Sequence, residues 1–161
     1  MAFRDTDRCL LKVVGTAEPI VVLRAADKAA PGLVRLWAAW AEETGVDKRR
    51  VLEANGCAAG MEQWTGGPRR WRTDLVYGLG PDCASAVPPQ SLGVDIIAET
   101  EPIFTLRAQD RSAPVLLRAW CGIARAHAED HTPDFALDAR LLQIFHFAGV
   151  MESWTVRKWP D

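Results

Sequence analysis

The sequence predicts an α+β domain in which two tandem β-β-α-α units share a small sheet and carry about four helices. Three observations lead to this fold class: an internal repeat, a run of β-branched residues near the start of each copy, and an amphipathic helical pattern after each run. The chain has 161 residues, of which 48% are hydrophobic and 25% charged. This composition is ordinary for a globular protein and permits one sizeable core.

The repeat is clearest where EPIVVLRAADKAAPGLVRLW (18–37) is set against EPIFTLRAQDRSAPVLLRAW (101–120). A constant shift of 83 residues aligns the two segments, and about half of their positions are identical, far above chance. Later, GMEQWT at 60–65 matches VMESWT at 150–155. We therefore expect a duplication, with a first unit at 9–73, a Gly/Pro-rich linker at 74–91 and a second unit at 92–161. Together they form one domain with internal pseudo-two-fold symmetry, a chain that is its own dimer.

Strands are expected at PIVVLRA (19–25) and PIFTLRA (102–108), where β-branched and apolar residues follow a proline. A weaker first strand is expected in each unit, at LLKVV (10–14) and GVDII (93–97). The linker holds one further short candidate, DLVYG at 74–78.

Helices follow the turn residues Asp27 and Asp110, each of which either caps the helix or forms the turn before it. A second helix is expected from near Asp47 in the first unit and from near Pro133-Asp134 in the second. Apolar residues at helical spacing predict the core-facing stripes of the two first helices. These are Leu33, Leu36, Trp37, Trp40 and Ala41 in one, and Leu116, Ala119, Trp120, Ile123 and Ala124 in the other.

The repeated pairs Arg24 with Asp27 and Arg107 with Asp110 are one candidate site. An arginine beside an aspartate at a strand-to-helix corner can bind an anion or act as a catalytic pair. The alternative is a structural salt bridge and a helix cap. A ligand site requires unpaired arginines that point into a pocket between the two units.

The basic-aromatic ends of the units are the second candidate: Arg69, Arg70 and Trp71 in one, and Arg157, Lys158 and Trp159 in the other. Arginine and tryptophan dominate interface hot spots and also stack on exposed nucleobases. The alternative is that both tryptophans fold back onto the helices.

Other chemistry-bearing residues give weaker signals. His127 and His131 are four apart, a metal-ligand spacing, but Pro133 follows and should end the helix before the second histidine. His146 lies in an apolar segment and is expected in the core or an interface. Glu62 and Glu152 match in the two units and can either face one cleft as paired carboxylates or lie on the surface. No nucleophile elbow, phosphate-binding loop or paired cysteines occur, so no catalytic residue, metal or cofactor is expected.

The net charge of −2 argues against nucleic-acid binding as the main activity. No signal peptide and no apolar run long enough to span a membrane are visible, and the four cysteines are scattered. A cytoplasmic protein, either a monomer with an internal pseudo-dimer or a homodimer, is expected.

The pattern E-P-I-F-T-L-R-A-Q-D-R-S-A-P at 101–114 and the closing M-E-S-W and R-K-W-P-D resemble a group of short uncharacterised proteins from bacteria and phages. In the first unit Ala26 replaces Gln109, and the end runs into the linker. The resemblance brings no activity. It implies that a single unit can exist alone and pair as a homodimer, and it makes a host-interaction role plausible.

The sequence therefore favours a non-enzymatic protein-interaction module, such as a phage-encoded inhibitor or adaptor acting on a host protein. One alternative is a small-molecule binding protein or enzyme with its site between the two units. A second is a nucleic-acid binder that uses the basic-aromatic ends.

Overall fold

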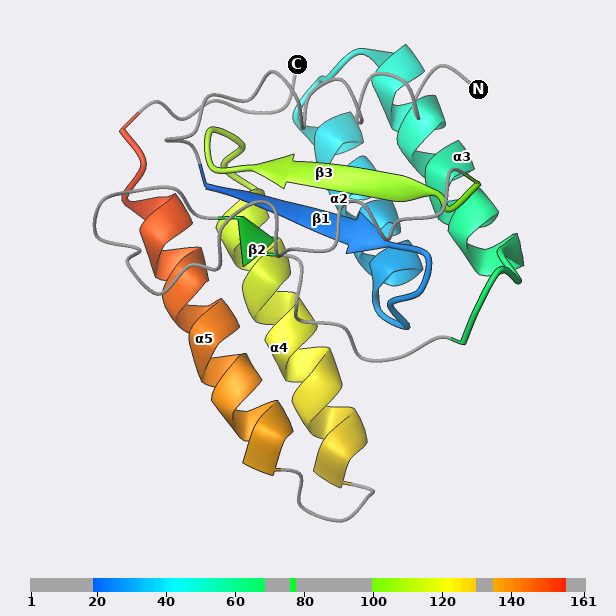
Figure 1. The fold of residues 1–161 in the computed structure, drawn as a ribbon. Coiled ribbons are helices and arrows are strands. Elements are labelled where there is room, and N and C mark those ends of the chain that lie inside the picture. Colours follow the sequence, from blue (N-terminus) through cyan, green and yellow to red (C-terminus); the bar gives the residue numbers. More distant parts are fainter. Residues whose placement is uncertain (1–18, 69–75, 78–99, 130–134, 156–161) are drawn as a thin grey trace.

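The computed structural model describes residues 19–68, 76–77, 100–129 and 135–155. Its elements alternate between short strands and helical hairpins (Figure 1). In chain order they are β1 (Ile20–Arg24), α2 (Ala30–Glu43), α3 (Lys48–Gln63), β2 (Val76–Tyr77), β3 (Ile103–Arg107), α4 (Ala113–Glu129) and α5 (Phe135–Glu152). The predicted α+β class, with a small sheet and four helices among the described residues, is confirmed.

The sheet is antiparallel, with strand order β2-β1-β3. In the main pair, Val22 of β1 lies opposite Thr105 of β3 at the centre of the register. The ladder continues past both strand ends, because Ala25 N donates to Pro102 O at 3.1 Å and Ala108 N donates to Pro19 O at 2.9 Å. The short strand predicted within 74–78 is confirmed as β2, so the linker adds a strand to the sheet. The strands predicted at 10–14 and 93–97 lie outside the described residues.

The helix boundaries follow from local turn chemistry. The helix α3 begins next to Asp47, as predicted, and Asp47 caps it, since its Oδ1 accepts a hydrogen bond from Arg49 N at 2.9 Å. Gly45, between α2 and α3, has a φ of 80°, a conformation that glycine adopts without steric cost. The last helix, α5, begins at Phe135, next to the predicted Pro133-Asp134 start. Asp27 forms the turn before α2, whose capping position is Ala29.

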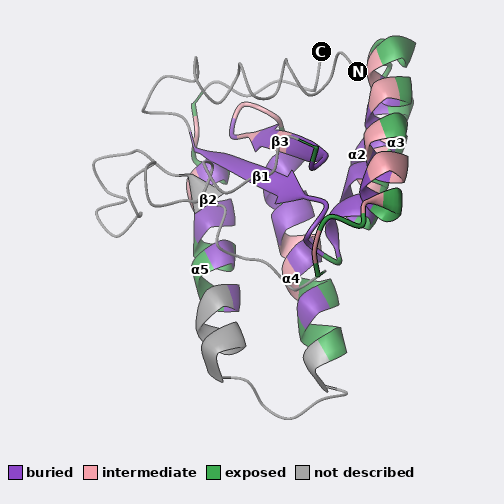
Figure 2. Ribbon diagram, turned by 45° about the vertical axis from the view of Figure 1, so that its right-hand side comes forward, coloured by how far each residue is buried: buried purple, intermediate pink, exposed green. Residues whose placement is uncertain are grey.

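The four helices cover one face of the sheet, in the order α3, α2, α4, α5 across the molecule (Figures 1 and 2). Alternate residues of the two central strands point into the same core as the helices: Val21, Leu23, Phe104 and Leu106. The indole of Trp37 meets the ring of Phe104 edge-on, with centroids 5.1 Å apart. The side chains of Ile20, Val22 and Ile103, on the opposite face, are buried as well.

The predicted core stripes are confirmed except at one position. Leu33, Trp37 and Ala41 are buried on α2, as are Leu116, Trp120 and Ala124 on α4. Ile123, however, is 45% exposed. Its neighbour Ala124 is fully buried, so the core-facing stripe of α4 runs through Ala124 and leaves Ile123 at the edge of the stripe.

Candidate functional site

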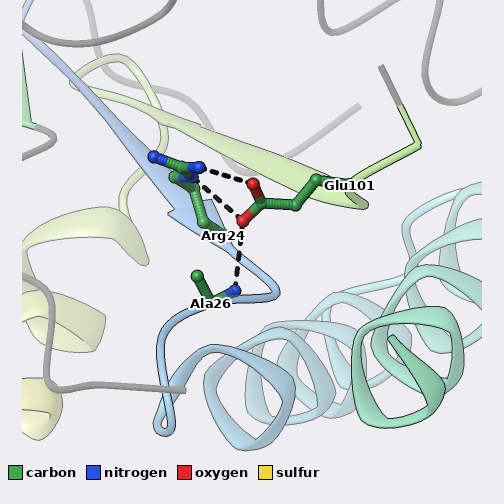
Figure 3. Close-up of polar contacts among 3 residues, drawn as sticks. All are labelled: Arg24, Ala26 and Glu101. Carbon is green, nitrogen blue, oxygen red and sulfur yellow. Dashed lines mark hydrogen bonds and ion pairs between the residues drawn. The ribbon is translucent and has the colours of Figure 1, made fainter. Parts of the chain in front are cut away.

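The strand-to-helix corner after β1 contains a buried ion pair (Figure 3). Arg24 Nε donates to Glu101 Oε1 at 3.0 Å, and Arg24 Nη2 donates to Oε2 at 2.5 Å. Ala26 N also donates to Oε1, at 3.1 Å. Both charged side chains are almost fully inaccessible to solvent. A bidentate arginine–carboxylate pair with a backbone donor satisfies both ions, so the corner is closed.

This arrangement corrects one alternative from the sequence. Arg24 is paired with Glu101, which precedes β3, and not with Asp27 three residues further along β1's own turn. The side chain of Arg24 is also buried and does not point into an open pocket. A ligand site between the units therefore loses Arg24 as its anion-binding group.

Asp27 and Asp110 hold the two halves of the fold together. Asp27 Oδ1 accepts from Ala29 N at 2.9 Å, and its Oδ2 accepts from the indole Nε1 of Trp120 at 2.7 Å. Asp110 Oδ1 accepts from Ser112 N at 2.8 Å, and its Oδ2 accepts from the indole Nε1 of Trp37 at 2.7 Å. Each carboxylate thus fixes its own turn and is bonded by a tryptophan from the other helical hairpin. Both aspartates are structural anchors in this geometry.

Arg107, the sequence match of Arg24, is half-buried at the end of β3. When the Gln109 amide is oriented with its oxygen toward the guanidinium, Arg107 Nε and Nη1 donate to that oxygen at 3.1 and 2.9 Å. Ala26 occupies the position of the first half that matches Gln109, and its backbone N–H donates a hydrogen bond to Glu101. The six basic-aromatic candidates all lie outside the described residues: Arg69, Arg70, Trp71, Arg157, Lys158 and Trp159.

Glu62 and Glu152 are engaged on the surface, each by the arginine of its own hairpin. Arg35 donates to Glu62 at 3.0 and 2.8 Å, and Arg118 Nη2 donates to Glu152 at 2.5 Å. These hydrogen bonds raise the pKa of both arginines above the usual range. The two glutamates lie in the last turns of α3 and α5, the outermost helices on opposite sides of the molecule (Figure 1). The hypothesis that they face one cleft as paired carboxylates is therefore wrong.

An apolar groove opens between α4 and α5. It has a volume of about 430 Å³, within the range of protein binding sites. Its described lining residues are Arg118, Cys121, Gly122, Arg125, Leu141, Leu142 and Phe145. The guanidinium of Arg118 lies over the Phe145 ring, 5.6 Å from its centroid, in a cation–π contact.

Two large apolar side chains of this groove are turned to solvent. Leu142 is 73% exposed and Phe145 is 56% exposed. They arise because α5 carries two apolar stripes. One stripe, with Leu141, Ile144, Ala148 and Met151, is buried in the core. The second contains Leu142 and Phe145, three residues apart, and remains uncovered within the described part of the chain.

Sequence reasoning missed this groove. The signal was present in LLQIFHF at 141–147, where apolar residues occupy more of the helix circumference than one core-facing stripe needs. Of the two expectations for His146, the core position is wrong, because its side chain is exposed on α5, and the interface position stays a prediction. His127 is exposed as well, and His131 lies outside the described residues.

Cys121, the thiol among the described lining of the groove, is not an activated nucleophile. Burial raises the pKa of the Cys121 thiol above its usual value of 9.0, so the unreactive protonated form dominates at neutral pH. Its Sγ lies 3.7 Å from the carbonyl oxygen of Leu141. Among the residues that the structure describes, no three or more His, Cys, Asp or Glu side chains come together as a metal site.

Comparison of the chain with protein-family models, curated proteins and solved structures found no match. None of the helices described here combines the length and apolar character needed to cross a membrane.

Proposed function

We propose that this protein is a non-enzymatic interaction module that binds another protein through the α4–α5 groove. The observation that carries the proposal is the exposure of Leu142 and Phe145 beside the groove. Burying large apolar side chains releases about 1.5–3 kcal/mol each, so such a pair has a strong tendency to be covered by a partner. An inhibitor or adaptor of bacterial or phage type, working in the cytoplasm on a host protein, fits this surface.

We further propose that the scaffold for this surface is a pseudo-two-fold domain made of two β-β-α-α units, 9–73 and 92–161. Three kinds of contact support it. The β1–β3 register is centred on Val22 and Thr105, which are 83 residues apart, the same shift as the repeat. The Trp–Asp hydrogen bonds cross between the halves at matching positions. The Arg35–Glu62 and Arg118–Glu152 pairs also occupy matching places.

The small-molecule alternative has less support. Its residues between the units are engaged, with Arg24 bonded to Glu101 and both aspartates bonded to tryptophans. The nucleic-acid alternative depends on the basic-aromatic ends in a chain with a net charge of −2.

Site-specific cross-linking in the full chain tests the proposal. A photoreactive phenylalanine analogue is placed at position 142 or, as a matched control, at position 52. Leu52 of α3 corresponds to Leu142 under the 90-residue shift that aligns GMEQWT with VMESWT, and it is 71% exposed. In lysate of the organism that encodes the protein, we expect one cross-linked partner from position 142 and none from position 52. Phe145→Ser should abolish the cross-link without changing the circular dichroism spectrum.

Equal labelling from both positions would contradict the proposal, because it would show that any exposed apolar position cross-links non-specifically. The alternative function would be favoured by a metabolite that raises the melting temperature of wild type and of the Phe145→Ser variant by the same amount.

A further inference from the structure

The groove differs in charge from the protein that carries it. The chain has a net charge of −2, yet the charged residues among the described lining of the groove are two arginines, Arg118 and Arg125. Arg118 is shared between Glu152 and the Phe145 ring. Arg125 is exposed and makes no ion pair within the described residues. Among the described residues, the site therefore presents a cation without a counter-ion, which an acidic partner can supply.

The dimensions of the groove match a short helix. Arg118 and Arg125 are seven residues apart on α4, about 10.5 Å along the axis at a rise of 1.5 Å per residue. On α5, Leu142 and Phe145 are one turn apart. An apolar stripe with a spacing of i, i+3 or i+4, and i+7 covers about two turns and fits between these residues.

The sequence-matched hairpin lacks two of these features, Arg125 and Phe145, which indicates that the fold does not require them. Under the 83-residue shift, Glu42 of α2 stands where α4 has Arg125. Under the 90-residue shift, the polar Asn55 of α3 stands where α5 has Phe145. The hairpin α2–α3 keeps its own match to Arg118, as Arg35, and its own exposed leucine, Leu52. At these two matched positions, the cation and the aromatic ring therefore occur in the α4–α5 hairpin and are absent from α2–α3.

We propose that the occupant of the groove is an amphipathic helix of a partner protein with acidic residues beside its apolar stripe. This inference rests on the proposed function and names the chemistry of its partner. Charge complementarity favours it over a second copy of the chain. Two copies joined groove to groove would bring Arg125 against the arginines of the other copy, in molecules that each carry a net charge of −2.

Binding of two helical peptides to the full chain tests the inference. Both peptides have about 18 residues and the same leucine stripe at i, i+3, i+4 and i+7, flanked by glutamates in one and by lysines in the other. Fluorescence anisotropy at about 0.1 M salt gives their affinities. We expect the glutamate peptide to bind about tenfold more tightly than the lysine peptide. Arg125→Glu, which copies Glu42, should remove or reverse the preference, and Leu52→Ser should leave it unchanged.

Phe145→Ser separates failure of this inference from failure of the proposed function. We expect it to weaken both peptides by about tenfold. Binding that depends on Phe145 but is equal for the two peptides would overturn the acidic partner and leave the interaction proposal intact. Failure of both peptides to bind at about 100 μM, an affinity already weak for a helix in a groove, would overturn the helical occupant.

Two further results would identify a different occupant of the groove. The first is measured by light scattering. A dimer that becomes monomeric on Phe145→Ser would identify a second copy as the occupant and overturn the inference. Recovery of peptide binding only after removal of residues 1–18 or 156–161 would identify the chain's own termini as the occupant, with the same consequence.

Discussion

The two helical hairpins, α2–α3 and α4–α5, are alike on the inside and different on the outside. The four buried residues of α3, Val51, Ala54, Ala58 and Met61, correspond to buried residues of α5, namely Leu141, Ile144, Ala148 and Met151. Away from the core, however, Glu42 and Asn55 correspond to Arg125 and Phe145. The matched positions are the ones that pack into the core. The exterior differences are where one hairpin is free to carry a function that the other lacks.

The largest expected effect comes from an interior contact. Glu101→Gln leaves the guanidinium of Arg24 buried without a carboxylate, which costs about 3–5 kcal/mol of the free energy of unfolding. Urea denaturation measures this loss. Glu62→Gln is the control on the outside, where solvent screens the pair with Arg35, and it should shift the midpoint far less. Similar shifts for the two variants would contradict the distinction between interior and exterior.

The crossed Trp–Asp hydrogen bonds give the next largest effect. Trp37→Phe and Trp120→Phe each remove the indole donor from a carboxylate and leave space where the larger ring was. We expect each to cost about 2–3 kcal/mol. Thermal or urea unfolding of the two variants sharpens the comparison, because matched contacts should cost nearly the same. A difference of more than about 1.4 kcal/mol, a factor of ten in the folding equilibrium constant, would contradict the equivalence of the two contacts.

A smaller effect, of opposite sign, is expected at the centre of the sheet. Thr105 Oγ1 is buried without a hydrogen-bond partner within the described residues, whereas its match in β1 is Val22. Thr105→Val keeps the shape and removes the unpaired hydroxyl, so it should raise the free energy of unfolding by about 1 kcal/mol. Val22→Thr, which would bury a second hydroxyl, should destabilise the protein. If Thr105→Val lowers the free energy of unfolding instead, the Thr105 hydroxyl has a hydrogen-bond partner. In that case β1 and β3 differ at this position by more than a methyl group and a hydroxyl.

The smallest effect concerns the Cys121 thiol and reports on the groove. Because burial raises the pKa of Cys121 above 9.0, its alkylation by iodoacetamide should still accelerate as the pH rises past 9. The same shift means that the thiol's contribution to stability is complete below the unfolded pKa and is lost as the pH rises through the folded pKa. Site-resolved mass spectrometry follows this cysteine among the four in the chain. Addition of the glutamate peptide should slow its alkylation, and no slowing would place the peptide elsewhere.

Local signals in the sequence predicted much of the fold. The β-branched runs located β1 and β3, Asp47 located the start of α3, and Val76–Tyr77 formed the short strand expected in the linker. Partners across the sheet were not predictable. Glu101 reaches Arg24 only because β1 and β3 pair with a register centred on Val22 and Thr105, and no residue near Arg24 encodes that register.

The groove was not predicted for a different reason. On α2 one apolar stripe faces the core, so burial can be assigned from spacing alone. On α5 the apolar residues spread over two faces, and only the packed structure decides that Ile144 is buried while Phe145 is exposed. Nothing in the sequence near Arg125 marks it as a binding residue. It becomes a candidate because it lines the same groove as Leu142 and Phe145, which belong to another helix.

The crossed Trp–Asp hydrogen bonds have a consequence for how the protein comes apart. The carboxylate that shapes the turn before α2 is held by α4, and the carboxylate that shapes the turn before α4 is held by α2. If either hairpin detached, the other would lose the donor that fixes its own first helix. Intermediates with one half folded are therefore disfavoured, and unfolding should be all-or-none. The two halves therefore cannot be exchanged or lost one at a time, because each donates a hydrogen bond that fixes a turn of the other.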